Sequence, residues 1–478
     1  MTDFKNQLYI NGAWRDSASG AVFDVINPFD ESVLSQCASA EVADAQDALT
    51  AAANAAPVWR GMTPRQRSVI LRKAFDLMTA RLPEFAELIT LENGKAKTDA
   101  MGEATYAAEF FRWFSEEAVR ADGNLTMAPA SGARILVHQK PAGIAYLITP
   151  WNYPAAMGTR KIAPALAAGC TVIVKPASET PLSLLALAAL LEEAGVPAGV
   201  VNILPSQKPA EISEVIMNDP RVRVVSFTGS TGVGRNLLKL AANQVLTPAM
   251  ELGGNAPLLV LHDADIDVAV EGAMLAKMRN MGEACTAANR LYVHASIATE
   301  FTEKLSAAMG KLTVGNGLEA GIDVGPLVNA ATRDKVSSFV CDAVEKGAKI
   351  EVGGVLPTGP GYFYPPTVLS NVPDNALCLD DEIFGPVAAI QTFTDEQAII
   401  AKANDTEYGL VAYVFTEDLK RGLHISEQLE FGMVGLNRGL VSDPAAPFGG
   451  VKQSGLGREG GHEGLMEFME TQYISTVW

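Results

Sequence analysis

Cys285 is the most reactive side chain in the stretch MGEACTAANR, residues 281–290. A thiolate is a strong nucleophile that can form a covalent intermediate with a carbonyl compound. A single free cysteine is, however, more often a small buried hydrophobe with no chemical role. The residue type alone leaves both interpretations open, so the other reactive side chains of the chain must decide between them.

Two polar side chains elsewhere could complete a nucleophilic site. Asn152 lies in TPWNYP, residues 149–154, directly after an apolar run. Its amide could donate to a developing oxyanion, or it could hydrogen-bond its own loop. Glu251 precedes two glycines in MELGGNAP, residues 250–257, where it could move to activate water, or it could be a solvated carboxylate beside a tight turn.

Two further motifs could bind phosphates and ribose. Lys175, in VIVKPASETP, ends an apolar run that reads as a strand, which would point it into the crevice where α/β sheets bind ligands. SFTGSTGVG, residues 226–234, would open a helix whose free amides can face a pyrophosphate. Its glycines do not form the GxGxxG fingerprint. A solvated lysine and a Gly-rich helix start without a ligand are the alternatives.

The elements that would position these residues are a hairpin, a helical region and two series of alternating strands and helices. LYINGAWRD reads as a hairpin that turns at Asn11-Gly12, and residues from about 41 to 120 follow a helical period. From about residue 144, short apolar runs alternate with helical segments, and a second such series runs from about 257 to 437. This alternation predicts parallel sheets in two α/β domains. The segment 124–141 and the C-terminus are strand-like, and we expect them to pair with a second subunit through exposed edges.

Length and charge restrict the partners. A chain of 478 residues is too long for one core, and 37 basic against 55 acidic residues give a net charge of −18, which disfavours nucleic acids and anionic membranes. The N-terminus lacks the pattern of a signal peptide, and no apolar run is long enough to span a bilayer. The five cysteines have no metal-like or disulfide-like spacing. We therefore expect no bound metal and a cytoplasmic location.

The order of the motifs decides between the alternatives. Six motifs follow one another in an order that resembles the aldehyde dehydrogenase superfamily; they are PWNYP, KPAS, FTGST, ELGGNAP, the Cys285 loop and DEIFGPV (381–387). The resemblance extends from YINGAW to the C-terminus. The resemblance implies a Rossmann-like cofactor-binding domain (1–123 and 142–252), a catalytic domain (253–457) and a small β oligomerisation arm (124–141 and 458–478). It also implies a homodimer or homotetramer.

The same resemblance assigns roles to individual residues. Cys285 would be the nucleophile, Glu251 the base and Asn152 the oxyanion donor. The cofactor NAD(P) would be held by Trp151, Lys175, Ser178, Gly229, Ser230, Gly234, Glu382 and Phe384. Because members that acylate coenzyme A generally lack the glutamate, its presence predicts hydrolysis to a free acid. Loss of the nucleophile, base or oxyanion donor would have indicated a non-catalytic member, and all three are present.

Within the superfamily the chain is most similar to succinate-semialdehyde dehydrogenases. In that group, two arginines and a serine bind the substrate carboxylate at the end opposite the aldehyde. The matching positions here are Arg160, Arg279 and Ser442. Two guanidinium groups suit a carboxylate and would offset the acidic surroundings locally. The alternative substrates are glutarate semialdehyde, 2-oxoglutarate semialdehyde or an aromatic aldehyde.

Three residues near these motifs bear on cofactor choice and on the reactivity of the thiol. At Ser178, NAD-preferring members commonly carry a glutamate that repels a 2′-phosphate, so NADP is the expected cofactor and NAD a usable one. The adjacent Glu179 could restore that repulsion by turning inward. Glu283, two residues before the thiol, could raise the pKa of Cys285 or point away from it.

Overall fold

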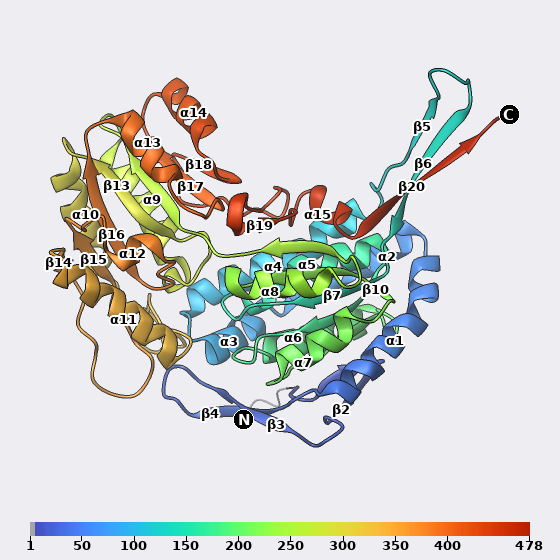
Figure 1. The fold of residues 1–478 in the computed structure, drawn as a ribbon. Coiled ribbons are helices and arrows are strands. Elements are labelled where there is room, and N and C mark those ends of the chain that lie inside the picture. The colour runs from blue at the N-terminus through green and yellow to red at the C-terminus, as the bar shows by residue number, and fades with distance from the viewer. Residues whose placement is uncertain (1–4) are drawn as a thin grey trace.

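The first of two large sheets carries the N-terminal half of the chain, in a computed structural model that describes residues 5–478 (Figure 1). Its central strands are parallel, and its outermost pairings are antiparallel. In spatial order its strands are β19 (Gly455–Leu456), β11 (Thr247–Glu251), β10 (Val222–Thr228), β7 (Ile144–Ile148), β8 (Thr171–Lys175), β9 (Val201–Ile203), β1 (Leu8–Ile10) and β2 (Ala13–Arg15). The predicted hairpin is confirmed as β1–β2, with Asn11 and Gly12 at φ 53° and 73° in its turn.

Helices cover this sheet. The predicted helical stretch forms four consecutive helices, which are α1 (Val42–Gly61), α2 (Pro64–Ala80), α3 (Leu82–Asn93) and α4 (Lys97–Glu117). The parallel strands are connected by α5 (Pro154–Ala168), α6 (Leu182–Ala194), α7 (Pro209–Met217) and α8 (Thr231–Ala241). Every residue of α5 is buried, and its sequence is mostly apolar apart from Thr159, Arg160 and Lys161.

The second sheet confirms the second α/β series. Its strands are parallel except at one edge, where β14 runs antiparallel to β15. In spatial order they are β14 (Lys349–Val352), β15 (Thr367–Ser370), β16 (Val387–Phe393), β13 (Ala288–His294), β12 (Ala256–Val260), β17 (Val411–Phe415) and β18 (Met433–Leu436). The main helices around them are α9 (Ile266–Met278), α10 (Ala298–Gly310), α11 (Ala330–Glu345), α13 (Glu396–Asn404) and α14 (Leu419–Gln428).

A third, three-stranded sheet projects from the body of the molecule (Figure 1). The hairpin of β5 (Asn124–Met127) and β6 (Arg134–Pro141) pairs with the C-terminal strand β20 (Met469–Thr476), so the two strand-like segments noted in the sequence lie together. Leu125, Met127 and Tyr473 are exposed on it. Its outer strands pair with nothing else in residues 5–478, and pairing with a second subunit stays a prediction.

The predicted domain limits remain a prediction, and the sheets differ from them at one point. β19, which lies within the range expected for the catalytic domain, pairs with β11 of the first sheet. A small two-stranded sheet of β3 (Val22–Ile26) and β4 (Val33–Ala38) lies beside the N-terminal elements. Within residues 5–478, no helix combines the length and the apolar character needed to cross a membrane.

The return of the chain to the first sheet depends on Gly455, and this yields a prediction. Gly455 lies opposite Glu251 at φ 139°, and a Cβ there would be 1.9 Å from the carbonyl oxygen of Met250. We expect Gly455→Ala to lower the free energy of unfolding by about 1–3 kcal/mol, because backbone must move to relieve the overlap. The measurement is the thermal unfolding midpoint by circular dichroism. Gly102→Ala, in α4 with nothing near the added Cβ, is the control and should leave the midpoint unchanged or raise it. Equal midpoints for the two variants would contradict the prediction.

Candidate active site

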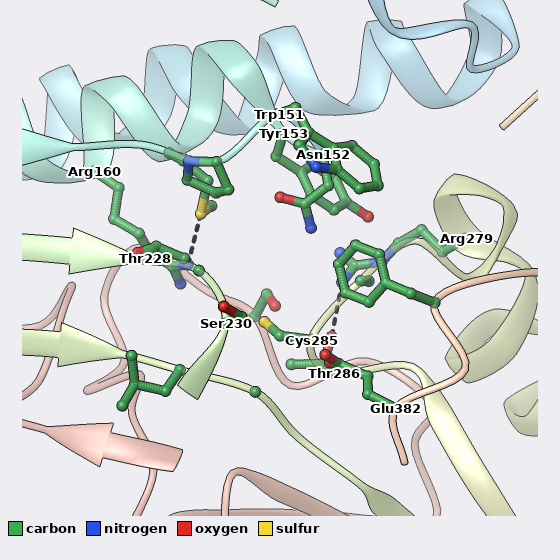
Figure 2. Close-up of a pocket in the computed structure, with 18 of the residues that line it drawn as sticks. Trp151, Asn152, Tyr153, Arg160, Thr228, Ser230, Arg279, Cys285, Thr286 and Glu382 are labelled. Carbon is green, nitrogen blue, oxygen red and sulfur yellow. Dashed lines mark hydrogen bonds between the residues drawn. The ribbon is translucent and has the colours of Figure 1, made fainter. Parts of the chain in front are cut away.

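A cavity of about 260 Å³ lies between the two large sheets and contains most of the residues singled out in the sequence (Figure 2). The first sheet contributes the loops that follow the carboxyl ends of its parallel strands, where α/β sheets bind ligands. The second contributes the loop before β13 and the loop before β16. The predicted residues that line the cavity are Trp151, Asn152, Arg160, Gly229, Ser230, Arg279, Cys285, Glu382, Phe384 and Ser442. Glu251, Lys175, Ser178 and Gly234 are not part of its wall.

Cys285 lies in a tight loop between α9 and β13. Asn280 and Met281 adopt left-handed backbone conformations, with φ of 54° and 57°, and Gly282 follows at 77°. On the other side Gly254 approaches so closely that a Cβ there would be 2.4 Å from the carbonyl oxygen of Cys285. These constraints leave the thiol partly exposed at the cavity wall.

Asn152 lies at the start of α5, and its amide is directed toward the cavity in which Cys285 lies (Figure 2). The side chain is buried, and Nδ2 donates to the carbonyl oxygen of Glu283 at 3.0 Å. A primary amide carries two N–H donors, so one remains for a substrate oxygen. The geometry of Asn152 is therefore that of a donor held at the nucleophile loop.

Burial dominates the electrostatics of the nucleophile. Burial raises the pKa of the Cys285 thiol to about 12, the Glu382 and Glu251 carboxylates add to the rise, and Arg160 and Arg279 oppose it. The thiol is therefore protonated in the free enzyme near neutral pH and needs a base. Glu283 is not one of the largest influences on this pKa. Its own carboxyl is buried, which raises its pKa to about 8, and one of its oxygens accepts from the Val328 backbone N–H.

Glu251 lies beside the cavity without lining it. One carboxylate oxygen would be 3.0 Å from a Cβ on Gly449, and the other is buried without a hydrogen-bond partner. Burial and the nearby Glu459 raise its pKa well above the usual value, against the opposing effect of Arg160 and Lys161. Because Glu251 does not line the cavity, we expect its side chain to rotate before it acts on the thiol or on a water molecule.

The two arginines line the same cavity but have different partners. Arg160, on α5, forms a salt bridge with Glu459 at 3.2 Å, donates to the Tyr106 hydroxyl at 3.1 Å and lies 3.8 Å above the Phe448 ring. Arg279 donates to the Thr286 hydroxyl at 3.3 Å and forms no salt bridge within residues 5–478. Arg279 therefore has more N–H donors without an anionic partner than Arg160, and it is the better candidate to bind an anionic ligand.

The residues predicted for a dinucleotide fit such a ligand at the start of α8. Ser230 is the N-cap of α8, and its hydroxyl accepts from the Val233 backbone N–H, so the other N–H groups of the first turn have no partner within the helix. The Thr228 hydroxyl is buried without a partner. A Cβ at Gly234 would be 2.4 Å from Leu252, so glycine allows α8 to lie close to the sheet. Trp151 and Phe384 face each other edge to face with ring centroids 5.4 Å apart at the cavity.

Neither Lys175 nor Ser178 lines the cavity. Lys175 ends β8 and is buried, which lowers its pKa, while Glu179 opposes the shift. Ser178 and Glu179 line a separate depression, and the serine hydroxyl donates to the Glu179 carboxylate at 3.3 Å. Glu382, across the cavity, accepts from the Gly254 backbone N–H at 3.3 Å, and burial raises its pKa to about 7.

Several lining residues carried no signal in the sequence. Tyr106 reaches the cavity from α4, and Tyr153, Thr332, Lys335 and Phe448 also line it. Tyr153 lies within the TPWNYP motif, although the sequence assigned it no role of its own. The other four residues belong to none of the motifs, and only the tertiary fold brings them to the cavity. An aromatic residue such as Tyr106 on an amphipathic helix reads as core material from sequence.

Comparison with known proteins decides the family. The sequence profile described as the aldehyde dehydrogenase family matches residues 14–474. The chain belongs to the aldehyde dehydrogenase family. This aldehyde dehydrogenase is 56% identical to a succinate-semialdehyde dehydrogenase of Paenarthrobacter nicotinovorans over 442 residues. The match covers 92% of this chain and 98% of the relative. It is 46% identical to a glutarate-semialdehyde dehydrogenase of Pseudomonas aeruginosa, over 98% of the chain and 97% of the relative.

A solved structure agrees with the fold of this aldehyde dehydrogenase. The crystal structure of an NADP-dependent enzyme of Escherichia coli superposes with a TM-score of 0.98 at 45% identity, over 99% of this chain and 98% of that chain. The predicted fold class, with a Rossmann-like and a catalytic α/β unit, is confirmed. The family also confirms that the chain is an NAD(P)-dependent oxidoreductase that acts on an aldehyde.

The raised pKa of Cys285 predicts slow and pH-dependent alkylation. Because only the thiolate reacts, the rate with iodoacetamide should rise continuously between pH 7 and pH 9.5 without reaching a plateau. Glu382→Gln removes the carboxylate that raises the pKa most after burial, so we expect alkylation several-fold faster at pH 8.5. The measurement is the time course of Cys285 modification by peptide mass spectrometry, with the exposed Cys341 as internal reference.

The neighbouring carboxylate provides the control for this experiment. Asp381→Asn removes the charge of the residue next to Glu382, and Asp381 is not one of the largest influences on the thiol pKa. It should leave the Cys285 alkylation rate unchanged. A plateau reached by pH 8 in the unmodified enzyme, or equal acceleration by both substitutions, would show that the Cys285 pKa is not raised in this way.

Proposed function

We propose that this enzyme oxidises succinate semialdehyde to succinate, with NADP as the preferred cofactor and NAD as a usable one. The observation that carries the proposal is the placement of Arg160, Arg279 and Ser442 on the wall of the cavity that exposes Cys285. A carboxylate at one end of a short substrate could bind the guanidinium groups while its aldehyde reaches the thiol. The similarity to a succinate-semialdehyde dehydrogenase supports this substrate.

Glutarate semialdehyde is the second candidate. It carries the same two functional groups with one additional methylene, and a glutarate-semialdehyde dehydrogenase is among the similar proteins. One methylene changes binding by only about 1–3 kcal/mol, so the same arginines could serve either substrate. An aromatic aldehyde has no carboxylate and would leave both arginines without a ligand.

The proposed reaction begins with a proton leaving the Cys285 thiol, for which a rotated Glu251 is the candidate acceptor. The thiolate sulfur then bonds to the aldehyde carbon, and the carbonyl π electrons move to the oxygen. The second N–H of Asn152 and the backbone N–H of Cys285 would hold that oxyanion. Bound NADP⁺ supplies the acceptor for the hydride that leaves the substrate carbon when the carbonyl re-forms, and Cys285 is left carrying a thioester.

Glu251 would also act in the second half of the reaction. It accepts a proton from a water molecule whose oxygen bonds to the thioester carbon. The carbon–sulfur bond then breaks, the electrons return to Cys285 as thiolate, and the free acid is released. The raised pKa of Glu251 suits a group that must bind a proton in each half-reaction.

Each cofactor residue has a proposed place. Lys175 and Ser178 would bind the adenosine ribose and its phosphate, and Glu382 the second ribose. Gly229, Ser230 and Gly234 would form the pyrophosphate site at the start of α8. Trp151 and Phe384 would flank the nicotinamide, and their edge-to-face contact at the cavity supports this placement.

We also propose that the enzyme is a homodimer or homotetramer and cytoplasmic. The arm formed by β5, β6 and β20 has unpaired outer strands within residues 5–478 and exposed apolar side chains, which favours pairing with another copy. All five cysteines are free thiols, as expected in a reducing compartment.

The substrate proposal predicts a selective effect of Arg279→Ala. We expect kcat/KM for succinate semialdehyde to fall by about 10²–10³, because a desolvated carboxylate loses a charged partner. The value for hexanal should change by less than about threefold, since hexanal has no carboxylate for a guanidinium to bind. Parallel steady-state assays with succinate semialdehyde, glutarate semialdehyde, hexanal and benzaldehyde provide the measurement. An equal loss for all substrates would assign Arg279 a structural role and remove the basis of the substrate proposal.

The cofactor proposal predicts that Glu179 limits the preference for NADP. Its carboxylate lies 3.3 Å from the Ser178 hydroxyl, where it would repel a 2′-phosphate. Glu179→Gln should raise the ratio of kcat/KM for NADP⁺ to that for NAD⁺ by about fivefold, the effect of one partly solvated charge. Glu427→Gln, an exposed substitution on α14, is the matched control and should leave the ratio unchanged. A fall in the ratio would place the phosphate elsewhere.

A further inference from the structure

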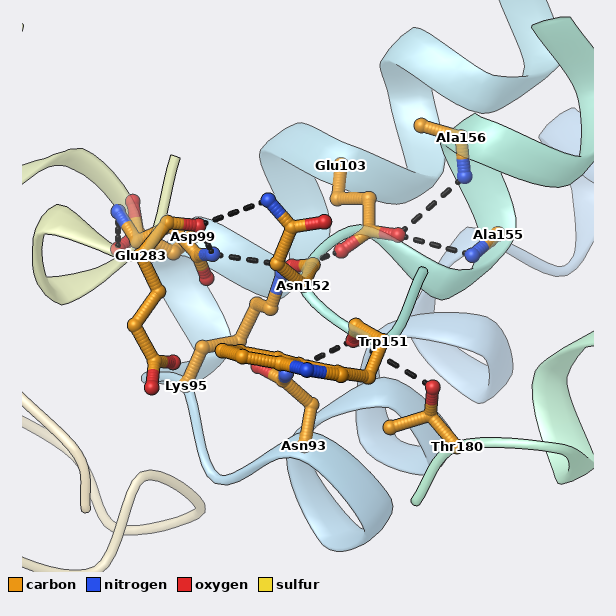
Figure 3. Close-up of polar contacts among 11 residues, drawn as sticks. Asn93, Lys95, Asp99, Glu103, Trp151, Asn152, Ala155, Ala156, Thr180 and Glu283 are labelled. Carbon is orange, nitrogen blue, oxygen red and sulfur yellow. Dashed lines mark hydrogen bonds and ion pairs between the residues drawn. The ribbon is translucent and has the colours of Figure 1, made fainter. Parts of the chain in front are cut away.

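A buried ion pair lies behind the cavity wall, next to Asn152 (Figure 3). Lys95, between α3 and α4, and Glu103, on α4, are 0% and 2% exposed, and Lys95 Nζ is 2.5 Å from a Glu103 carboxylate oxygen. Neither residue lines the cavity. The reaction outlined above does not use them, so the burial of these two ionisable side chains needs a different explanation.

The pair contacts the chain on both sides of the Asn152 side chain. Lys95 Nζ donates to the carbonyl oxygen of Asn152 at 2.7 Å. The other oxygen of Glu103 accepts from the backbone N–H groups of Ala155 and Ala156, at 2.9 and 3.3 Å. Glu103 thereby binds amides of the first turn of α5, a helix whose N-cap residue Tyr153 provides no side-chain hydrogen bond. Both ends of the segment 152–156 are fixed by one ion pair.

The nucleophile loop completes the arrangement from the opposite side. Asn280 Nδ2 donates both to the carbonyl oxygen of Asn152, at 2.9 Å, and to that of Glu283, at 2.8 Å. The Asn152 amide itself donates to the same Glu283 oxygen. The position of the Asn152 backbone relative to Cys285 is therefore set by a donor from each domain, Lys95 and Asn280.

The energetics favour a positioning role over a purely stabilising one. A buried ion pair loses most of its attraction to desolvation and contributes little net stability compared with apolar residues of similar volume. It does impose geometry, because an unpaired buried charge is strongly unfavourable and each partner must stay where its contacts are. An oxyanion donor must be held to within about 0.5 Å to be effective.

We propose that Lys95 and Glu103 are positioning residues that hold the Asn152 amide at the oxygen of the Cys285-bound substrate. Lys95 fixes the Asn152 carbonyl, and Glu103 fixes the helix start that follows it. The proposal rests on the proposed function, in which Asn152 is an oxyanion donor. It assigns to two residues outside every reactive motif an effect on the rate of the first half-reaction.

The test is a double-mutant cycle on the first turnover. Lys95→Met keeps the length of the side chain and removes the ammonium donor. We expect the rate of the NADPH burst at saturating succinate semialdehyde to fall about 10- to 100-fold, part of the 10²–10³ expected for Asn152→Ala. In the Asn152→Ala background, Lys95→Met should cost less than about twofold, because the group it positions is absent. The KM for the aldehyde should change by less than about threefold in all variants, since the arginines are untouched.

Two further variants separate positioning from loss of structure. Lys95→Met/Glu103→Met removes both charges, so no unpaired carboxylate stays buried and folding is retained even where Lys95→Met alone is unstable. It should show the same burst defect. Arg67→Met is the matched control, because the buried Arg67 guanidinium donates to the Ala167 carbonyl near the opposite end of α5. It should lower the unfolding midpoint and leave the burst rate unchanged.

The outcomes distinguish this proposal from the proposed function. If Lys95→Met lowers the burst rate by the same factor with and without Asn152, or if Arg67→Met produces an equal defect, the positioning role is wrong and the pair is structural. If Asn152→Ala leaves the burst rate unchanged, the oxyanion role in the proposed function fails first. Non-additive loss in the cycle, with an unaffected control, supports both.

Discussion

Reciprocal hydrogen bonds between the Asn152 loop and the Cys285 loop are the contact on which the site depends. Asn152 and Glu283 lie in loops of different sheets and are 131 residues apart. Asn152 donates to the Glu283 carbonyl oxygen, and Asn280 donates to the carbonyl oxygens of both Asn152 and Glu283. Addition of a thiolate to a carbonyl requires reacting atoms aligned at about 3–3.5 Å. These hydrogen bonds join loops of the two large sheets at the place where that alignment is needed.

The burial of this site also has an electrostatic consequence, because an anionic substrate must enter an acidic protein. The chain has a net charge of −18, and the proposed substrate is an anion, so attraction must come from inside the cavity. Arg160 is partly neutralised by Glu459, whereas Arg279 is stacked near Tyr153 and paired only with a hydroxyl. Desolvation strengthens an unneutralised guanidinium as a carboxylate partner. The cost is a thiol that stays protonated until a base reaches it.

Sequence predicted the elements well because their signals are local. Apolar runs of strand length and the Asn11-Gly12 turn identify strands directly, and the order of motifs identified the family. Contacts between distant segments were not predictable in this way. Tyr106 reads as a helical core residue, and the pairing of β19 with β11 depends on a close backbone approach at Gly455. The raised pKa of Glu251 likewise depends on burial and on charges such as Glu459 and Arg160, which only the fold brings together.

Helix α4 shows why such residues escape sequence motifs. Asp99, Glu103 and Tyr106 are spaced four and three residues apart, so they share one face of the helix. Asp99 accepts from the backbone N–H of Asn280 at 2.8 Å, Glu103 binds the start of α5, and Tyr106 accepts from Arg160. This one helix therefore contacts the nucleophile loop, the start of α5 after the oxyanion donor Asn152, and Arg160, one of the two candidate carboxylate ligands. The contacts of each side chain depend on its position on the helix. In the sequence alone, each of the three is an ordinary polar residue with no sign of these contacts. A displacement of α4 would alter all three sites together, which couples the geometry of substrate binding to that of the chemical step.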